Sequence, residues 1–210
     1  MANGQGYGQG GGGQMGPQDQ EAFLAHLKNT FAQLPQEISI VLFSKPGVQD
    51  VFSDANRRVI KAFREMTDKI KFREFDLGHK EAEKYGVEHA STLVIAPDRY
   101  NIRWIGAPVG EEGRTFLEML ILVGMGESGL NEQAAKVIRR IDTPRDVKIF
   151  VSPSCPYCPQ QAINGVKAAI ENPEMVNLEL VDIQCNPRIA DQYEAHSVPQ
   201  TFANDMMIGM

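Results

Sequence analysis

The stretch "VKIFVSPSCPYCPQQAINGVKAAIE" (147–171) decides the fold, because it joins three local patterns in a fixed order. The run "VKIFVS" is apolar and β-rich, which is typical of a buried strand. The residues from Pro156 onward predict a helix. Between the two, "SCPYC" (154–158) places two cysteines three positions apart, so that their sulfurs come within disulfide reach on one helical turn.

The two cysteines are expected to differ in reactivity. The thiolate is the reactive form of cysteine, and a free thiol with a pKa of about 8.5 is mostly protonated at neutral pH. Cys155 is expected at the helix start, exposed and activated by unpaired N–H groups and the helix dipole, with Cys158 more buried one turn later. Pro156 suits a first helical turn. This asymmetry predicts Cys155 as the nucleophile and Cys158 as the resolving thiol of disulfide exchange.

Two other uses of the cysteine pair stay open. A structural zinc site needs four ligands; Cys185 and His196 could complete one, but not at a recognisable spacing. A purely structural disulfide is disfavoured in a reducing cytosol. We therefore favour redox catalysis without a metal ion, and keep a non-catalytic module that binds metal or an iron–sulfur cluster as an alternative.

Composition bounds the class of protein. The chain has 210 residues, of which 42% are hydrophobic, enough for one large or two small cores. The net charge of -6 gives no general attraction to nucleic acid or to an anionic membrane. No apolar run approaches the roughly 18 residues of a membrane span. The N-terminus lacks the basic and apolar regions of a secretory signal, so a cytoplasmic protein is expected.

The predicted elements repeat at an offset of about 108 residues, which indicates two copies of one domain. At this offset Cys155 and Cys158 fall on Gly47 and Asp50, so the first copy lacks the cysteines. We expect a disordered Gly/Gln-rich tail (1–18), a first unit without CxxC (19–128) and a second unit with CPYC (129–210).

The first unit is predicted to hold four helices and four strands, and the second unit to repeat them without the last helix. One face of the second sheet is then expected to be partly uncovered, as in a piece of a longer protein. The predicted helices are 19–34, 50–69, 80–86, 111–124, 131–141, 156–171 and 188–196, and the predicted strands are 37–44, 70–77, 91–97, 101–107, 146–152, 177–183, 199–203 and 206–210.

The segment 147–170 together with "SVPQT" (197–201) resembles the active site of the thioredoxin/glutaredoxin superfamily. The resemblance implies a cis bond between Val198 and Pro199, a proline that faces the CxxC, and a Val198 backbone that binds a substrate chain. Pro156, Tyr157, Val198 and Pro199 are thus the expected substrate-binding residues. Over 19–210 the chain resembles glutaredoxin-like protein disulfide oxidoreductases. It is also similar to the N-terminal region of the alkyl hydroperoxide reductase flavoprotein subunit, whose first unit is inactive.

Two departures from the superfamily pattern are visible. Thioredoxins carry a buried acid on the strand before the CxxC, and "VKIFV" (147–151) has none. Glutaredoxins have a Gly-Gly turn after the last strand, where this chain offers only Gly209, so glutathione binding is not expected as the main activity.

Other residues receive ordinary roles. Cys185 is interpreted as a packing residue and His196 as a surface histidine. Trp104 is expected to pack within the inactive unit. Lys148 and Lys167 are expected to be solvated.

These observations predict an α/β fold with two tandem thioredoxin-like domains packed as one body. The expected activity is thiol–disulfide exchange, chiefly reduction of protein disulfides, with electrons from a flavin-dependent reductase. An electron-relay domain between a flavoprotein and a peroxidase is the alternative. No cofactor is expected in this chain, and neither nucleic acid nor a membrane is an expected partner.

Overall fold

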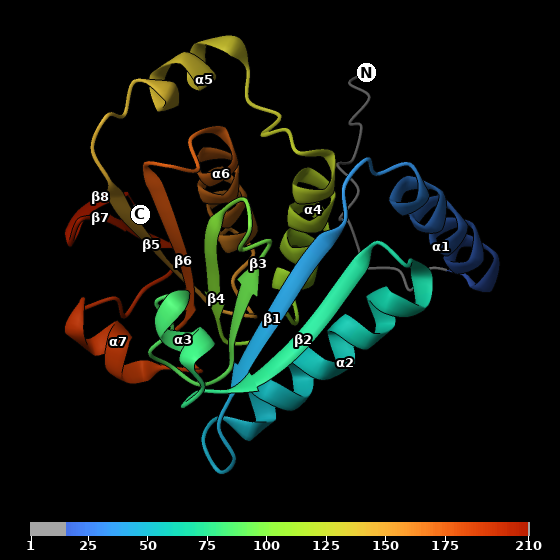
Figure 1. Cartoon of the computed structure of the whole chain (residues 1–210), viewed down its shortest axis with the longest axis horizontal. Coiled ribbons are helices and arrows are strands. Elements are labelled where there is room, and N and C mark those ends of the chain that lie inside the picture. Colours follow the sequence, from blue (N-terminus) through green and yellow to red (C-terminus); the bar gives the residue numbers. More distant parts are fainter. Residues whose placement is uncertain (1–15, 210) are drawn as a thin grey trace, which may run out of the picture.

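The structure is a computed structural model that describes residues 16–209 (Figure 1). Its two halves repeat one order of elements up to the last strand of the second. The first half contains α1 (Pro17–Ala32), β1 (Ile38–Ser44), α2 (Asp50–Met66), β2 (Ile70–Asp76), α3 (Lys80–Lys84), β3 (Thr92–Ile95), β4 (Asn101–Ile105) and α4 (Glu112–Met125). The second contains α5 (Glu132–Arg139), β5 (Arg145–Val151), α6 (Cys158–Glu171), β6 (Val176–Asp182), α7 (Pro187–Gln192), β7 (Gln200–Ala203) and β8 (Met206–Gly209).

The first helix begins slightly earlier than expected. Of the predicted tail, residues 1–15 lie outside the described residues, and α1 begins at Pro17, two residues before the expected start. We propose 19–128 and 129–210 as the two units, since no helix or strand interrupts the segment between α4 and α5.

The eight strands form a single sheet in the order β2-β1-β3-β4-β6-β5-β7-β8. The two halves meet where β4 pairs with β6 in parallel, from Asn101 opposite Asn177 to Ile105 opposite Val181. The expected pair of sheets is therefore fused into one. No local sequence pattern predicts this pairing. The two strands are about 75 residues apart, and each has the apolar pattern of an ordinary strand.

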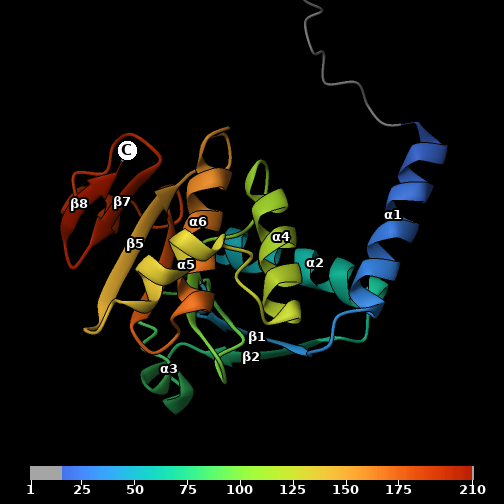
Figure 2. The same cartoon turned by 90° about the horizontal axis from the view of Figure 1, so that it is seen from above.

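Helices cover both faces of the sheet. Along β5, Ile149 packs with the buried residues of α6 and α4, whereas its neighbour Phe150 packs with α7. This alternation follows from the two-residue period of a strand. Figure 2 shows α2, α4 and α6 together on one face and α3 on the other. Trp104 of β4 is fully buried on the face that α4 covers, and its ring packs edge-to-face with Phe116 of α4. This agrees with the packing role predicted for it.

An ion cluster crosses the junction of the two halves. Glu179 of β6 accepts a hydrogen bond from Arg103 Nε of β4 at 3.0 Å and contacts the ammonium group of Lys148 of β5. Burial alone would raise the pKa of Glu179, but the two cations hold it below its usual value. Lys148 is therefore paired rather than solvated. Lys167 is paired as well, with Glu118 of α4 at 3.6 Å.

The final strand of the second half lacks a helical cover within residues 16–209. Met206, Met207 and Ile208 of β8 are exposed, whereas the equivalent strand of the first half, β4, packs under α4. The partly uncovered face that the sequence predicts is thus present. None of the helices in the described part of the chain is both long and apolar enough to cross a membrane.

Candidate active site

The cysteine pair lies at the junction between the end of β5 and the start of α6. A disulfide joins Cys155 to Cys158, with their Cα atoms 5.5 Å apart. The helix begins at Cys158, so the expected start at Pro156, with Cys155 directly at the helix start, is wrong by two residues. Pro159 occupies the first helical turn instead. The reason is a turn before the helix, in which the N–H of Cys155 donates to the carbonyl of Ser152 at 3.0 Å.

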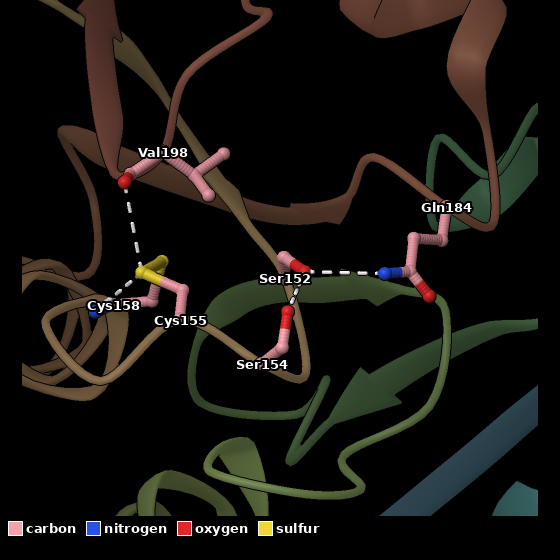
Figure 3. Close-up of a disulfide and its surroundings, with 6 residues drawn as sticks. All are labelled: Ser152, Ser154, Cys155, Cys158, Gln184 and Val198. Atoms are coloured by element: carbon pink, nitrogen blue, oxygen red, sulfur yellow. Dashed lines mark hydrogen bonds between the residues drawn. A yellow bond between two sulfur atoms is a disulfide. The ribbon is translucent and has the colours of Figure 1, made fainter.

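Burial of the pair is nearly complete. Cys158 is fully buried, as expected, but Cys155 is only 7% exposed, which contradicts the expectation of an exposed thiol. Figure 3 shows why: the chain at Val198 passes beside the disulfide, and its carbonyl oxygen lies 3.6 Å from Sγ of Cys155. A local reading of the sequence could not include this contact, which comes from a segment 43 residues away.

The backbone at the helix start is directed at the first sulfur. The N–H of Cys158 donates to Sγ of Cys155 at 3.1 Å. This N–H belongs to the first turn of α6, where backbone donors lack helical partners. After reduction of the disulfide, the same contact and the helix dipole favour a thiolate on Cys155 over a thiol.

The predicted substrate-binding residues surround this point. The Val198–Pro199 bond is cis, as the resemblance implied. Pro156 is exposed, and Tyr157 between the cysteines has 76% of its surface exposed. The structure therefore brings the disulfide and the Val198–Pro199 segment together. The side chain of Tyr157 lies at the protein surface beside them. The roles of these residues in binding stay predictions.

Side chains that the sequence did not single out support the cysteine turn. Gln184 Nε2 donates to Ser152 Oγ at 3.3 Å, and Ser152 Oγ lies at the same distance from Ser154 Oγ (Figure 3). Beside the cis proline, Gln161 Nε2 of α6 donates to Thr201 Oγ1 at 2.7 Å. These Ser, Gln and Thr residues have no distinctive spacing in the sequence, so only the folded chain identifies their contacts.

Two buried acids stand near the cysteine turn. Glu112 at the start of α4 and Asp182 at the end of β6 are each 1% exposed. No hydrogen bond of ordinary geometry reaches either Glu112 oxygen, and the nearby hydroxyl of Thr115 only partly offsets the burial of the carboxyl group. Burial raises the pKa of Glu112 to about 7, and the charges of Asp182 and Glu111 add to the rise. Burial also raises the pKa of Asp182. The neighbouring N–H of Glu111 donates to the carbonyl of Pro153, which places Glu112 beside the cysteine turn.

Sequence reasoning missed Glu112 because the acid comes from the inactive half. The resemblance to thioredoxins predicts a buried acid on the strand before the CxxC, whereas Glu112 lies at the start of a helix, where acids are usually exposed. Adjacent Glu111 is exposed and gives no sign that its neighbour is buried.

The remaining candidates stand apart from the pair. Cys185 is fully buried in the cluster around Phe150, as a packing role predicts. His196 is exposed, and its Nδ1 lies 3.9 Å from a carboxylate oxygen of Asp191. Among residues 16–209, no group of three or more His, Cys, Asp or Glu side chains is arranged to hold a metal ion.

Cys185 is expected to be unreactive in the folded protein. Burial, with a contribution from the Asp182 charge, raises the pKa of its thiol to about 12, so almost no thiolate forms at neutral pH. After reduction of the chain, iodoacetamide should label Cys155 under native conditions and the fully buried Cys185 only in denaturant. Mass spectrometry of the labelled peptides checks this, and rapid native labelling of Cys185 would contradict it.

The fold and the cysteine pair define a thiol–disulfide oxidoreductase of thioredoxin fold. A family model described as "Thioredoxin domain" matches residues 145–208. A thioredoxin from Methanocaldococcus jannaschii is 33% identical over 58 residues, which cover 28% of this chain and 68% of that protein. The chain belongs to the thioredoxin family.

Two solved structures resemble the chain along almost its full length. A protein disulfide oxidoreductase from Aeropyrum pernix K1 superposes with a TM-score of 0.78 at 25% identity, and the match covers 90% of this chain and 86% of that one. The NTD_N/C domain of alkylhydroperoxide reductase AhpF from Enterococcus faecalis gives a TM-score of 0.78 at 26% identity, covering 90% and 93%. The likeness therefore includes the half without cysteines as well as the half with them.

Proposed function

We propose that this protein reduces disulfides in other proteins, with Cys155 as nucleophile and Cys158 as resolving thiol. The observation that carries the proposal is the position of Sγ of Cys155, between the N–H of Cys158 and the carbonyl of Val198. The first contact favours a thiolate, and the second marks the backbone along which an extended substrate segment can lie. The exposed ring of Tyr157 adds an apolar contact beside it.

The exchange has two steps. The thiolate of Cys155 attacks one sulfur of the substrate disulfide; that S–S bond breaks, and the departing substrate thiolate takes a proton. Cys158 then loses its proton and attacks Sγ of Cys155, which releases the second substrate sulfur as a thiolate that is protonated in turn. The substrate gains two electrons and two protons, and the Cys155–Cys158 disulfide is formed.

The second step needs a base for the fully buried Cys158, and we propose Glu112 for this role. A carboxylate with a pKa of about 7 is half ionised at neutral pH, which matches the optimum for proton transfer near that pH. Glu112 supplies from the first half the buried acid that the strand 147–151 lacks. In this proposal the half without cysteines contributes the base, and the other half contributes both thiols.

The oxidised pair must be reduced again, and we propose a flavin-dependent reductase as the donor in the cytoplasm. The likeness to a domain of alkylhydroperoxide reductase AhpF supports this choice and also favours a second candidate function. In that alternative the chain relays electrons from a flavoprotein to a peroxidase, and the same two cysteines carry them.

A redox titration tests the proposal. The full chain with Cys185→Ser is equilibrated in glutathione buffers, and the oxidised fraction of Cys155–Cys158 is measured by thiol labelling. We expect one reversible two-electron transition near the thioredoxin potential of about -270 mV, and reduction of insulin disulfides by the reduced form. A value near the disulfide-isomerase range would support oxidation or isomerisation instead. Reaction with a peroxidase but not with insulin would favour the relay, and the lack of any reversible transition would refute both.

A further inference from the structure

The loop between β4 and α4 lies directly against the cysteine turn of the other half. The N–H of Glu111 in this loop donates to the carbonyl oxygen of Pro153 at 2.9 Å. Pro153 is two residues before Cys155 and follows Ser152, whose carbonyl accepts from the N–H of Cys155. The loop therefore holds the turn from which the nucleophilic sulfur projects.

Two glycines allow this close approach. Gly110 has φ +62°, and a Cβ built on it would lie 2.3 Å from the carbonyl oxygen of Pro153. Gly106 has φ +121°, and its Cβ would lie 2.5 Å from Cβ of Asp182. Both backbone conformations suit glycine, and neither site has room for a side chain.

Gly106 is also connected to the cysteine turn, through Asp182 and Gln184. Asp182 accepts the backbone N–H of Gln184 on its carboxylate at 2.9 Å. The side chain of Gln184 in turn donates to Ser152 Oγ (Figure 3). Both ends of the loop 106–111 thus reach the segment from Ser152 to Cys155, one through Pro153 and the other through Asp182.

We propose that the loop 106–111, here called the strap, positions the redox pair by fixing the cysteine turn against the start of α6. Gly110 and Glu111 are positioning residues in this account, since they act on Cys155 through Pro153. The inference rests on the proposed function, because it takes Cys155 and Cys158 as the reacting pair.

The strap should influence the chemistry through one hydrogen bond. The N–H of Cys158 stabilises a thiolate on Cys155 only while Sγ stays near its present 3.1 Å. If the turn shifts, the reduced form loses this stabilisation and the disulfide does not. The reduction potential then becomes more negative and the pKa of the Cys155 thiol rises. A hydrogen bond to a charged group supports a change of roughly tenfold, which for a two-electron couple is about 30 mV.

The test compares Gly110→Ala with Gly129→Ala in the full chain carrying Cys185→Ser. Gly129 also has a positive φ of +65°, but its Cβ would find Leu122 at 3.6 Å and nothing of the cysteine turn. Both variants carry the same type of backbone strain, so a difference between them reports the contact with Pro153. The readouts are the potential of the pair and the pH profile of Cys155 alkylation. We expect a potential about 30 mV more negative for Gly110→Ala only.

A second variant covers the case in which Gly110→Ala fails to fold. Glu111→Pro removes the N–H that donates to Pro153, and Glu111 has φ -59°, which suits the proline ring. It should shift the potential in the same direction. If a folded variant at either site matches the parent in potential and alkylation profile, the strap has no positioning role. If the parent itself shows no reversible transition, the proposed function fails first, which separates the two failures.

Discussion

Replacing Cys155 by serine is expected to lower the rate of protein-disulfide reduction by at least roughly a thousandfold, because a serine hydroxyl supplies no thiolate. Cys158→Ser should behave differently. It keeps the first step and loses the second, so the substrate stays attached to Cys155 as a mixed disulfide. Insulin reduction measures the rate, and mass spectrometry under non-reducing conditions detects the adduct.

The matched control for both variants is Cys185→Ser. This third cysteine is fully buried and lies in a different cluster from the pair, so its replacement should leave the rate within about twofold of the parent. The assignment would be reversed if Cys155→Ser formed the stable adduct and Cys158→Ser did not. Equal loss of activity in Cys185→Ser would show that a third thiol takes part in the exchange.

Glu112→Gln is expected to stabilise the oxidised protein above neutral pH and to slow the exchange. The folded-state pKa of about 7 lies above the ordinary value of 4.5. Between these values the folded chain holds a proton that the unfolded chain has lost. The free energy of unfolding therefore falls as pH rises through this window, by about 3 kcal/mol. Glutamine cannot lose the proton, so the variant keeps that stability.

Denaturant unfolding at pH 5 and pH 8 measures the effect. The variant should match the parent at pH 5 and exceed it by about 2 kcal/mol at pH 8. Glu127→Gln, at an exposed position after the end of α4, is the control and should follow the parent at both values. Parallel curves for parent and Glu112→Gln would show that Glu112 does not stay protonated in the folded chain.

The same substitution should reduce the rate of insulin reduction roughly a hundredfold, which is the usual scale of general base catalysis. In the parent, the rate should rise as pH passes through about 7 and Glu112 becomes ionised. In the variant this rise should be lost. Stability and activity then move in opposite directions, as is common where an active site holds a destabilising group.

The sequence predicts elements of the fold well wherever one strand or helix determines its own pattern. The apolar strand at β5, the helix at α6 and the repeat that equates the start of α2 at Asp50 with that of α6 at Cys158 are all visible in the residue order. The proline at 199 is also recognisable from its neighbours. These features depend on residues that are close together in the chain.

What the sequence did not predict depends on contacts between segments that are far apart in the chain. Cys155 is buried in the main core cluster and lies against the carbonyl of Val198, and Glu112 is buried near Asp182 at the end of β6. The strap is marked only by Gly106 and Gly110, and loops often contain glycine for reasons that involve no partner. In each case the deciding neighbour is more than 40 residues away, so no local spacing reports it.

The parallel pairing of β4 with β6 determines how the molecule could be divided. A chain that began at residue 129 would leave one side of β6 as an open sheet edge, with unpaired N–H and C=O groups from Asn177 to Val181. Such an edge is a template for pairing with other chains and invites aggregation. It would also separate Glu179 from Arg103. The cysteine-free half therefore covers a sheet edge of the reactive half, and we expect a chain cut at residue 129 to aggregate more readily than the full chain.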